Sequence, residues 1–257
     1  MKTRWINLLI GLLFTHISLA QTEMAVIKGG TFVPLYGTDS LPVNVTDFKM
    51  DVYPVTVAQY LKYIKKNPKW QKTKIIELFA DQNYLSNWVS DTIIGQTIPL
   101  NAAVTNVSWF AAKDYCSCMG KRLPTVDEWE FVAMANETVK DARTIPDYNE
   151  FILAWYERPK TYKNPIGSTF KNAYGIYDLH GLVWEWTLDF NSILVSGESR
   201  KDVDSDANLF CGSGAVGAND LMNYAAFMRY ALRGSLKANF AMKNLGFRCV
   251  KDIPIKK

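Results

Sequence analysis

The chain has 257 residues, and 48% of them are hydrophobic, which is enough for one large domain or two small ones with a sizeable core. The 29 Lys and Arg residues nearly balance the 25 Asp and Glu residues, so net charge gives no reason to expect a nucleic-acid or membrane-surface partner. Eight Trp, thirteen Tyr and thirteen Phe make the chain rich in aromatic residues. Large rings bury much area per residue, which suits a compact fold with little regular structure.

The N-terminus has the pattern of a secretory signal peptide. Lys2 and Arg4 precede an apolar stretch over residues 6–17, and Ser18 and Ala20 supply the small residues of a cleavage site. The alternative is a short membrane anchor, but about twelve residues are too few to cross a hydrocarbon core of roughly 30 Å. We therefore expect residues 1–20 to be removed, and the mature protein to be exported to the periplasm without a lipid anchor or a membrane-spanning segment.

The first predicted elements of the mature chain are two short strands and a helix. Residues 24–33 are predicted to form a strand, a tight turn at two glycines and a second strand. Thr56 and Gln59 have the spacing of a capping box, which predicts a helix that starts at residue 57. Apolar residues at positions 57, 60, 61 and 64 share one face of that helix, and the Asn-Pro pair at 67–68 ends it.

Six lysines lie between residues 62 and 74, interleaved with Tyr63 and Trp70. A basic stretch with aromatic residues can bind nucleic acid. An exported protein rarely meets nucleic acid, so we interpret these lysines as a solvated helix face and expect no nucleic-acid partner.

Two further helices are predicted in the middle of the chain. Ser108 is a typical N-cap for a helix through residue 119, with Gly120 as its stop. Thr125 and Glu128 form a second capping box, which predicts a helix over residues 126–135. From Tyr156 onward the chain is rich in turn residues, so loops, short strands and few helices are expected there. All elements are short and no strand–helix–strand alternation is present, which favours one domain.

Four cysteines remain after residue 20: Cys116, Cys118, Cys211 and Cys249. Export permits disulfides, and four cysteines allow three pairings that the sequence alone does not distinguish. Cys116 and Cys118 are a weak metal signal, because residues two apart on a helix point to different faces. Cys211 is open to two interpretations: a redox thiol or Cu(I) ligand, or a buried thiol or structural disulfide.

Several motifs in this sequence resemble those of one known family. They are V-I-K-G-G-T-F at 26–32, P-V-T-V-A-Q-Y at 54–60, V-T-N-V-S-W at 104–109, G-K-R-L-P-T-V-D-E-W-E-F at 120–131, N-A-Y-G-I-Y-D-L-H-G-L-V-W-E-W at 172–186 and N-L-G-F-R-C at 244–249. In this order they resemble the formylglycine-generating enzyme family, also called sulfatase-modifying factors. The resemblance implies an α+β fold, with a single domain over residues 21–257 that is a variant of the C-type lectin fold with low regular secondary structure.

Each motif also has a purely structural explanation. Glycines 175 and 181 permit tight turns, and tryptophans 184 and 186 alternate as core-filling residues of a strand would. Asp127, Glu128 and Glu130 favour the positive end of a helix, which is a more ordinary role than paired acid–base catalysis.

The residues that carry the family's chemistry are missing. In copper-dependent members two cysteines five residues apart bind copper, because soft sulfur selects Cu(I). The spacing of Arg229 and Arg233 assigns Ala225 and Tyr230 to those positions, and no cysteine lies between residues 212 and 248. Another branch uses a three-histidine iron site, but His180 is the single histidine after residue 20. We therefore expect neither copper nor iron, and no formylglycine-generating activity.

The resemblance also implies a structural calcium ion. Asp178 and Glu185 would supply carboxylates, and Gly181 and Val183 would supply backbone carbonyls, the oxygen ligands that Ca²⁺ prefers. Leu182 stands where the family usually has Asn. The alternative is a loop held together by direct hydrogen bonds.

The resemblance further implies a disulfide between Cys116 and Cys249. If an enzyme activity of another kind survives, its pocket would be lined by Cys211 and the 224–233 segment, with Tyr224, Arg229 and Arg233 as the candidate residues.

Within the family, the segments at 191–192, 210–215 and 226–229 resemble exported accessory proteins associated with copper-type nitrite reductase in denitrifying bacteria. Our leading hypothesis is an accessory, maturation or binding protein that acts on another exported protein or peptide segment. The alternatives are a divergent oxidase or oxygenase that acts on a peptide, and a lectin-like ligand-binding module.

Overall fold

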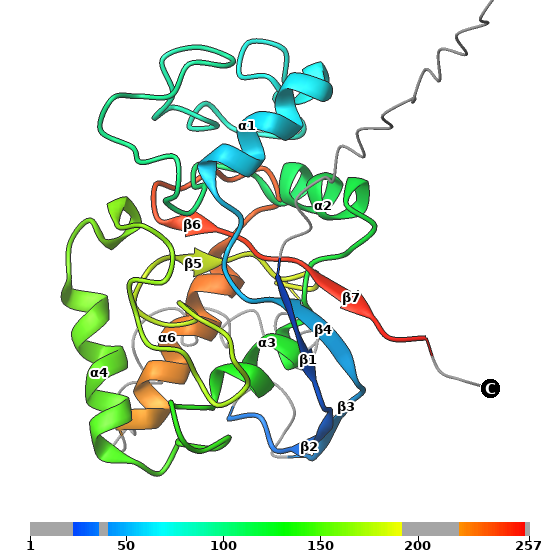
Figure 1. Cartoon of the computed structure of the whole chain (residues 1–257). Helices are drawn as coiled ribbons and strands as arrows, with labels where there is room; N and C mark the ends of the chain where they lie inside the picture. Colours follow the sequence, from blue (N-terminus) through cyan, green and yellow to red (C-terminus); the bar gives the residue numbers. More distant parts are fainter. Residues whose placement is uncertain (1–22, 36–40, 192–220, 255–257) are drawn as a thin grey trace, which may run out of the picture.

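The computed structural model describes residues 23–35, 41–191 and 221–254, and the side chains of all of these except residues 221–224 (Figure 1). The expected signal peptide and Cys211 lie outside the described residues, as does the side chain of Tyr224. The described chain forms a single domain of mixed helix and strand in which loops outweigh regular elements.

Within the described residues the strands are short and form three small sheets. They are β1 (Met24–Ile27), β2 (Gly30–Phe32), β3 (Val43–Val45), β4 (Phe48–Asp51), β5 (Trp184–Glu185), β6 (Leu245–Gly246) and β7 (Val250–Asp252). The antiparallel sheet β1-β4-β7 brings both ends of the domain together, β2 pairs with β3, and β5 pairs with β6 in parallel.

The two strands predicted within residues 24–33 are present, but they do not pair with each other. β1 pairs with β4, and β2 pairs with β3 in a different sheet. Gly29 lies between β1 and β2 in sequence, at a point where the backbone of Val45 passes very close. A Cβ at Gly29 would lie 2.0 Å from the Val45 carbonyl oxygen. A glycine is required there by the close approach of a second chain segment.

The capping signals mark helix starts correctly. The helices are α1 (Val57–Lys66), η1 (Pro68–Trp70), α2 (Trp109–Cys118), α3 (Val126–Ala133), α4 (Pro146–Glu157), η2 (Thr161–Lys163) and α6 (Leu221–Ser235). Thr56 and Thr125 each complete a capping box, and Ser108 caps α2. Gly120 follows α2 with φ +65°, a left-handed conformation that suits glycine at a helix end.

The longest described helix is α6, and it lies in the part of the chain where we expected mainly loops. Its 15 residues pack beside α4 (Figure 1). Positions 225, 226, 229, 230 and 233 of this helix are buried. Their spacing of three and four residues places them on one helix face. The turn-rich stretch before α6 obscured this signal.

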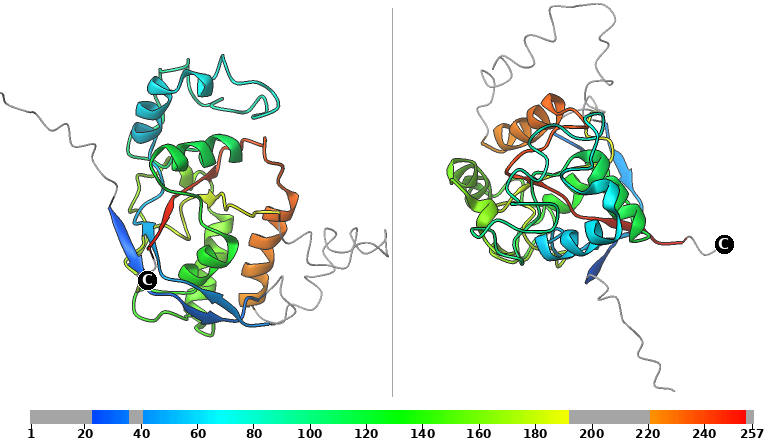
Figure 2. Two further views of the ribbon diagram at one scale, coloured as in Figure 1. Left: turned by 90° about the vertical axis from the view of Figure 1, so that its right-hand side faces the viewer. Right: turned by 90° about the horizontal axis from the view of Figure 1, so that it is seen from above.

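Two main clusters of buried side chains form the core. One lies under α1 and α2 and contains Tyr60, Trp186 and Phe247, and the other lies between the β1-β4-β7 sheet and α3. Figure 2 shows α1 and α2 at one end of the molecule and the α4–α6 pair toward the other end.

The structure pairs Cys116 and Cys249 in a disulfide, the pairing implied by the family resemblance. The bond joins α2 to the residue before β7 across 133 positions in sequence, and both cysteines are fully buried. Cys118 is a free, exposed thiol.

None of the helices in the described part of the chain is long and apolar enough to cross a membrane.

Candidate functional site

Helix α6 carries Ala225 and Tyr230, the two positions that we assigned from the sequence to the family's copper-binding cysteines. Ala225 and Tyr230 are both buried, with exposed fractions of 1% and 6%. Ala225 packs against Tyr148 and Ile152 of α4. Its carbonyl oxygen accepts a hydrogen bond of 3.0 Å from the Tyr156 hydroxyl. These positions therefore serve helix packing and contain no thiolate.

The same helix carries the two arginines named as candidate pocket residues, and both are bound to a single buried carboxylate. Arg229 donates to Glu130 at 3.0 Å, 3.2 Å and 2.8 Å, and Arg233 donates to the same carboxylate at 2.6 Å. The Arg233 guanidinium carbon also lies 4.9 Å from the centroid of the Trp129 ring. The two cations and one anion form a buried triad that fixes α6 onto α3.

The charges in this triad stabilise one another. Burial by itself would raise the pKa of Glu130, but the two guanidinium groups outweigh burial and lower that pKa to about 2. Burial would also lower the pKa of Arg229, and the Glu130 carboxylate raises it above its ordinary value. Glu130 and Arg229 are therefore charged at neutral pH, and both arginines of the triad are engaged by the Glu130 carboxylate.

A small cavity of about 20 Å³ lies beside the triad, with Glu130, Arg143, Tyr148 and Ala225 among the residues that line it. A cavity of that size holds about one water molecule.

His180 is buried beside the same helices. Its Nε2 lies 3.0 Å from the Ala133 carbonyl oxygen, and its ring makes edge contacts with Trp129, Tyr148 and Trp155. Burial, together with the positive charge of Arg229, lowers the pKa of His180 to about 3. His180 is therefore a neutral core residue near pH 7.

Both carboxylates of the expected calcium site already have hydrogen-bond partners. Asp178 has φ +63° and accepts hydrogen bonds from the Gly167 amide and from the amide and hydroxyl of Thr169, the last two at 3.0 Å. Glu185 accepts from Arg248 at 2.8–3.0 Å and from the Trp129 indole at 2.8 Å.

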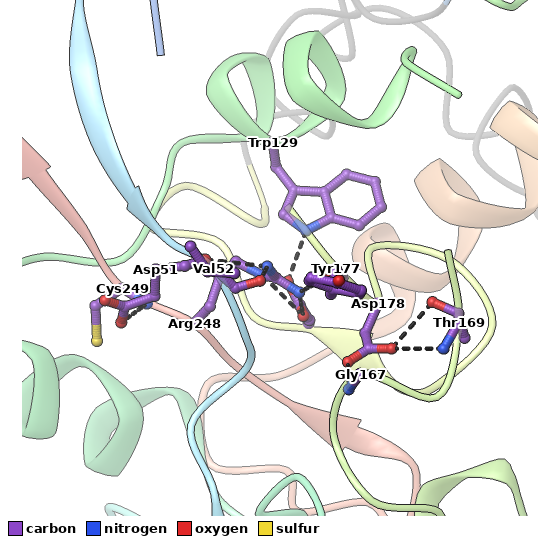
Figure 3. A network of polar contacts seen from close by, with 10 residues as sticks. Asp51, Val52, Trp129, Gly167, Thr169, Tyr177, Asp178, Arg248 and Cys249 are labelled. Atoms are coloured by element: carbon purple, nitrogen blue, oxygen red, sulfur yellow. Dashed lines mark hydrogen bonds and ion pairs between the residues drawn. The ribbon is translucent and has the colours of Figure 1, made fainter. Parts of the chain in front are cut away.

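Arg248 is the centre of this network. It also donates to the backbone carbonyls of Asp51, Val52 and Tyr177 at 3.1 Å, 3.3 Å and 2.9 Å. Figure 3 shows Arg248 between the Asp51–Val52 backbone and Tyr177, while Asp178 turns toward Gly167 and Thr169. Both side chains of the Glu185–Arg248 pair are 0% exposed. The guanidinium thus ties four separate chain segments together.

As they stand, these residues do not fit an open oxygen cage for Ca²⁺. Both oxygens of Glu185 face a guanidinium cation, and Asp178 is bound to a different loop. The described residues contain no cluster of three or more His, Cys, Asp or Glu side chains that could hold a metal ion. Calcium binding by Asp178, Gly181, Val183 and Glu185 stays an untested prediction, and the hydrogen-bonded loop is the alternative that these contacts favour.

Chelation distinguishes the two alternatives. We expect the melting temperature to be equal in EDTA and in millimolar Ca²⁺, because Arg248 already neutralises Glu185. A shift on the order of 5 °C, removed by Asp178→Asn, would instead establish the calcium site, since Ca²⁺ at a hundredfold excess over Kd stabilises a fold by about 2.7 kcal/mol. The exposed carboxylate Glu137, changed to Gln, is the control, because it belongs to neither arrangement.

An open cleft of about 310 Å³ lies beside the C-terminal end of α4, at residues that we had not selected from the sequence. Its aromatic residues are Trp155, Tyr156, Tyr162 and Trp184, and Tyr156 stacks on Trp184 with ring centroids 5.0 Å apart. The lining also contains three basic residues: Arg158, Lys160 and Lys243. We had interpreted Trp184 as core filling, but it is only half-buried, whereas Trp186 is fully buried. The aromatic cleft is within reach of α6, because Tyr156 also contacts Ala225.

These observations define a class of protein: a single mixed α+β domain with little regular structure, in which a buried ion triad fixes helix α6 onto α3. The solved structure of CarF has the same fold, with a TM-score of 0.52 and 17% identity over 91% of this chain and 99% of that chain.

The chain belongs to the family described as "Sulfatase-modifying factor enzyme 1-like domain", which matches residues 12–253. It is similar to the "Inactive C-alpha-formylglycine-generating enzyme 2" of Bos taurus, at 28% identity over 281 residues, covering 88% of this chain and 87% of that protein. It is also similar to the formylglycine-generating enzyme of Mus musculus, at 26% identity over 288 residues, covering 91% and 76%.

The serine/threonine-protein kinase pkn1 of Chlamydia caviae is 29% identical over 177 residues, which cover 66% of this chain. The match spans only 28% of the length of that kinase. The kinase name therefore describes a protein much longer than the shared region.

Proposed function

We propose that this protein is an exported accessory or binding protein that lacks the oxidase activity of its enzymatic relatives. The observation that supports the proposal most directly is the packing and ion pairing of helix α6. Ala225 and Tyr230 are packed in the core, and the arginines beside them are held by Glu130. The name of the bovine relative, an inactive formylglycine-generating enzyme, agrees with this proposal.

The aromatic cleft suits a segment of another protein. The half-buried rings of Tyr156 and Trp184 offer apolar contact, and the basic residues around them offer charge, a combination that suits a ligand cleft of a few hundred Å³. The partner that we propose is an exported protein, with a role in the maturation of a copper-type nitrite reductase in the periplasm. That choice of partner rests on the resemblance of residues 191–192, 210–215 and 226–229 to accessory proteins of that system.

The protein is expected not to convert cysteine to formylglycine in a sulfatase-type peptide. The physical reason is that no thiolate pair is available on α6 to bind Cu(I) and activate oxygen. Purified protein should be incubated with the peptide, copper and oxygen, and the peptide mass measured. The mouse formylglycine-generating enzyme, assayed on the same peptide, shows that the assay works.

Conversion of the peptide, or stoichiometric copper or iron in the purified protein, would contradict the proposal and favour a divergent oxidase. The accessory role is tested separately by deletion of the gene in its own host. Loss of exported nitrite reductase activity is expected, and unchanged activity would remove nitrite reductase as the partner.

A further inference from the structure

A second groove lies at the α1–α2 end of the molecule, between the segment that follows α1 and the outer face of α2. Its volume is about 430 Å³, within the range of ordinary ligand sites. We call it the lysine groove and define it by the residues that line it: Lys69, Trp70, Lys74, Ile76, Phe79, Phe110, Lys113, Asp114 and Ser117. It shares no residue with the aromatic cleft.

The floor of the lysine groove is apolar. Phe79 makes an edge-to-face contact with Phe110 at 5.3 Å and lies 6.1 Å from Trp70, measured between ring centroids. Ile76 and Phe79 are 55% and 37% exposed, and Leu78 beside them is 69% exposed. Adjacent exposed apolar side chains with a polar rim mark interaction surfaces on soluble domains.

The rim of the lysine groove is positively charged. Lys74 and Lys113 are exposed and form no salt bridge with any described residue, whereas Lys69 pairs with Asp114 at 3.3 Å. Among the described residues that line the groove, Asp114 is the single acidic one. Its carboxylate also accepts hydrogen bonds from the Trp70 indole at 2.6 Å and from the Tyr63 hydroxyl. Asp114 is therefore engaged in holding the floor, and the charge left for a ligand is that of the lysines.

The arrangement of the rings in the floor distinguishes between two kinds of anionic ligand, single-stranded nucleic acid and an acidic peptide. Single-stranded nucleic acid binds by stacking its bases on open aromatic faces. Here Trp70 is only 6% exposed, and Phe79 and Phe110 meet at an interplanar angle of 67°, so the rings form a pocket for a side chain instead of a stacking platform. A peptide that carries carboxylates on either side of an apolar side chain matches the pocket of rings and the lysines at its rim.

We infer that the lysine groove binds an acidic peptide segment of a partner protein. An aromatic or large aliphatic side chain of the peptide rests on Phe79 and Phe110, and carboxylates on either side pair with Lys74 and Lys113. This surface is independent of the aromatic cleft, so its existence does not depend on the proposed accessory function.

Fluorescence polarisation with labelled peptides tests the inference on the full mature chain. The probes are a short Asp/Glu-rich peptide with one central Phe, the same peptide with Ala in place of Phe, and its Lys-rich counterpart. We expect the first probe to bind, the second to bind more weakly, and the third not to bind. Binding should weaken as salt rises, because exposed charge pairs are screened.

The double variant Lys74→Glu/Lys113→Glu should weaken binding of the first peptide by roughly tenfold or more, since each 1.4 kcal/mol of lost interaction is a factor of ten. The matched control is Lys49→Glu/Lys251→Glu, which reverses two exposed lysines on β4 and β7 that line neither groove and should bind as wild type does. All four lysines are exposed, so both variants should melt as wild type does.

Equal binding by both double variants, or no binding of the acidic peptide at all, would overturn the inference. Tighter binding of a single-stranded oligonucleotide than of the acidic peptide would also overturn it, and would assign the groove to nucleic acid.

Discussion

Arg248→Met is expected to lower the free energy of unfolding by roughly 3–5 kcal/mol, because removing one partner of a buried ion pair leaves the other charge unpaired. Glu185 would retain only the Trp129 indole as a donor, and the carbonyls of Asp51, Val52 and Tyr177 would lose the hydrogen bonds that Arg248 donates. For a domain of this size the melting temperature should fall by roughly 6–20 °C, which calorimetry or circular dichroism measures.

Two further variants identify the cause of that loss. Arg248→Lys keeps the positive charge but lacks the planar fork that reaches a carboxylate and three carbonyls, so it should recover only part of the stability. Lys251→Met removes an exposed cation from β7 and should change the free energy of unfolding by less than about 0.5 kcal/mol. If Arg248→Met melts within a degree of wild type, the network does not stabilise the fold.

Glu130→Gln is expected to cost a similar amount, roughly 3–5 kcal/mol, because it leaves two buried guanidinium groups without an anion. The loss should appear first as separation of α6 from α3, which hydrogen exchange of the α6 amides would detect. Glu137→Gln, an exposed carboxylate close in sequence, is the matched control and should be neutral.

The triple variant Glu130→Leu/Arg229→Met/Arg233→Met separates charge from packing. Apolar residues of similar volume often replace a buried ion network without loss of stability, so the triple variant should be markedly more stable than Glu130→Gln. If both variants are equally unstable, the stability of this site comes from the packing of the three native side chains and not from the pairing of their charges.

The Glu130 triad also predicts a pH dependence of stability. The pKa of Glu130 lies at about 2 in the folded protein and near 4.5 ordinarily, so the unfolded chain binds the proton first as pH falls. The stabilisation is complete above pH 4.5 and is lost as the pH falls toward 2. The Glu130→Gln variant has no such carboxylate, so its stability should decline less steeply than that of wild type over this window in acid-unfolding curves.

The sequence by itself determined the features that depend on neighbouring residues. Thr56, Ser108 and Thr125 cap helices through atoms three positions away, so these helix starts could be predicted without knowledge of the fold. The motif order predicted the family, and the absence of cysteine between residues 212 and 248 is a property of the sequence alone.

Only the tertiary structure decided which charges meet. Glu130 lies 99 positions from Arg229, and Glu185 lies 63 positions from Arg248, so neither spacing contains a signal of contact. From the sequence, Glu185 was a ligand for calcium and Arg229 was a pocket residue, because an isolated charge is expected to face solvent, a metal ion or a substrate. A buried charge must be paired with an opposite one, and the fold supplies partners from distant segments at both sites. Strand pairing is also decided by the tertiary structure. β1 pairs with β4 and not with its neighbour in sequence, because the β1-β4-β7 sheet buries one face against the core around α3 while Lys49 and Lys251 stay exposed on the other, and no local pattern contains that choice.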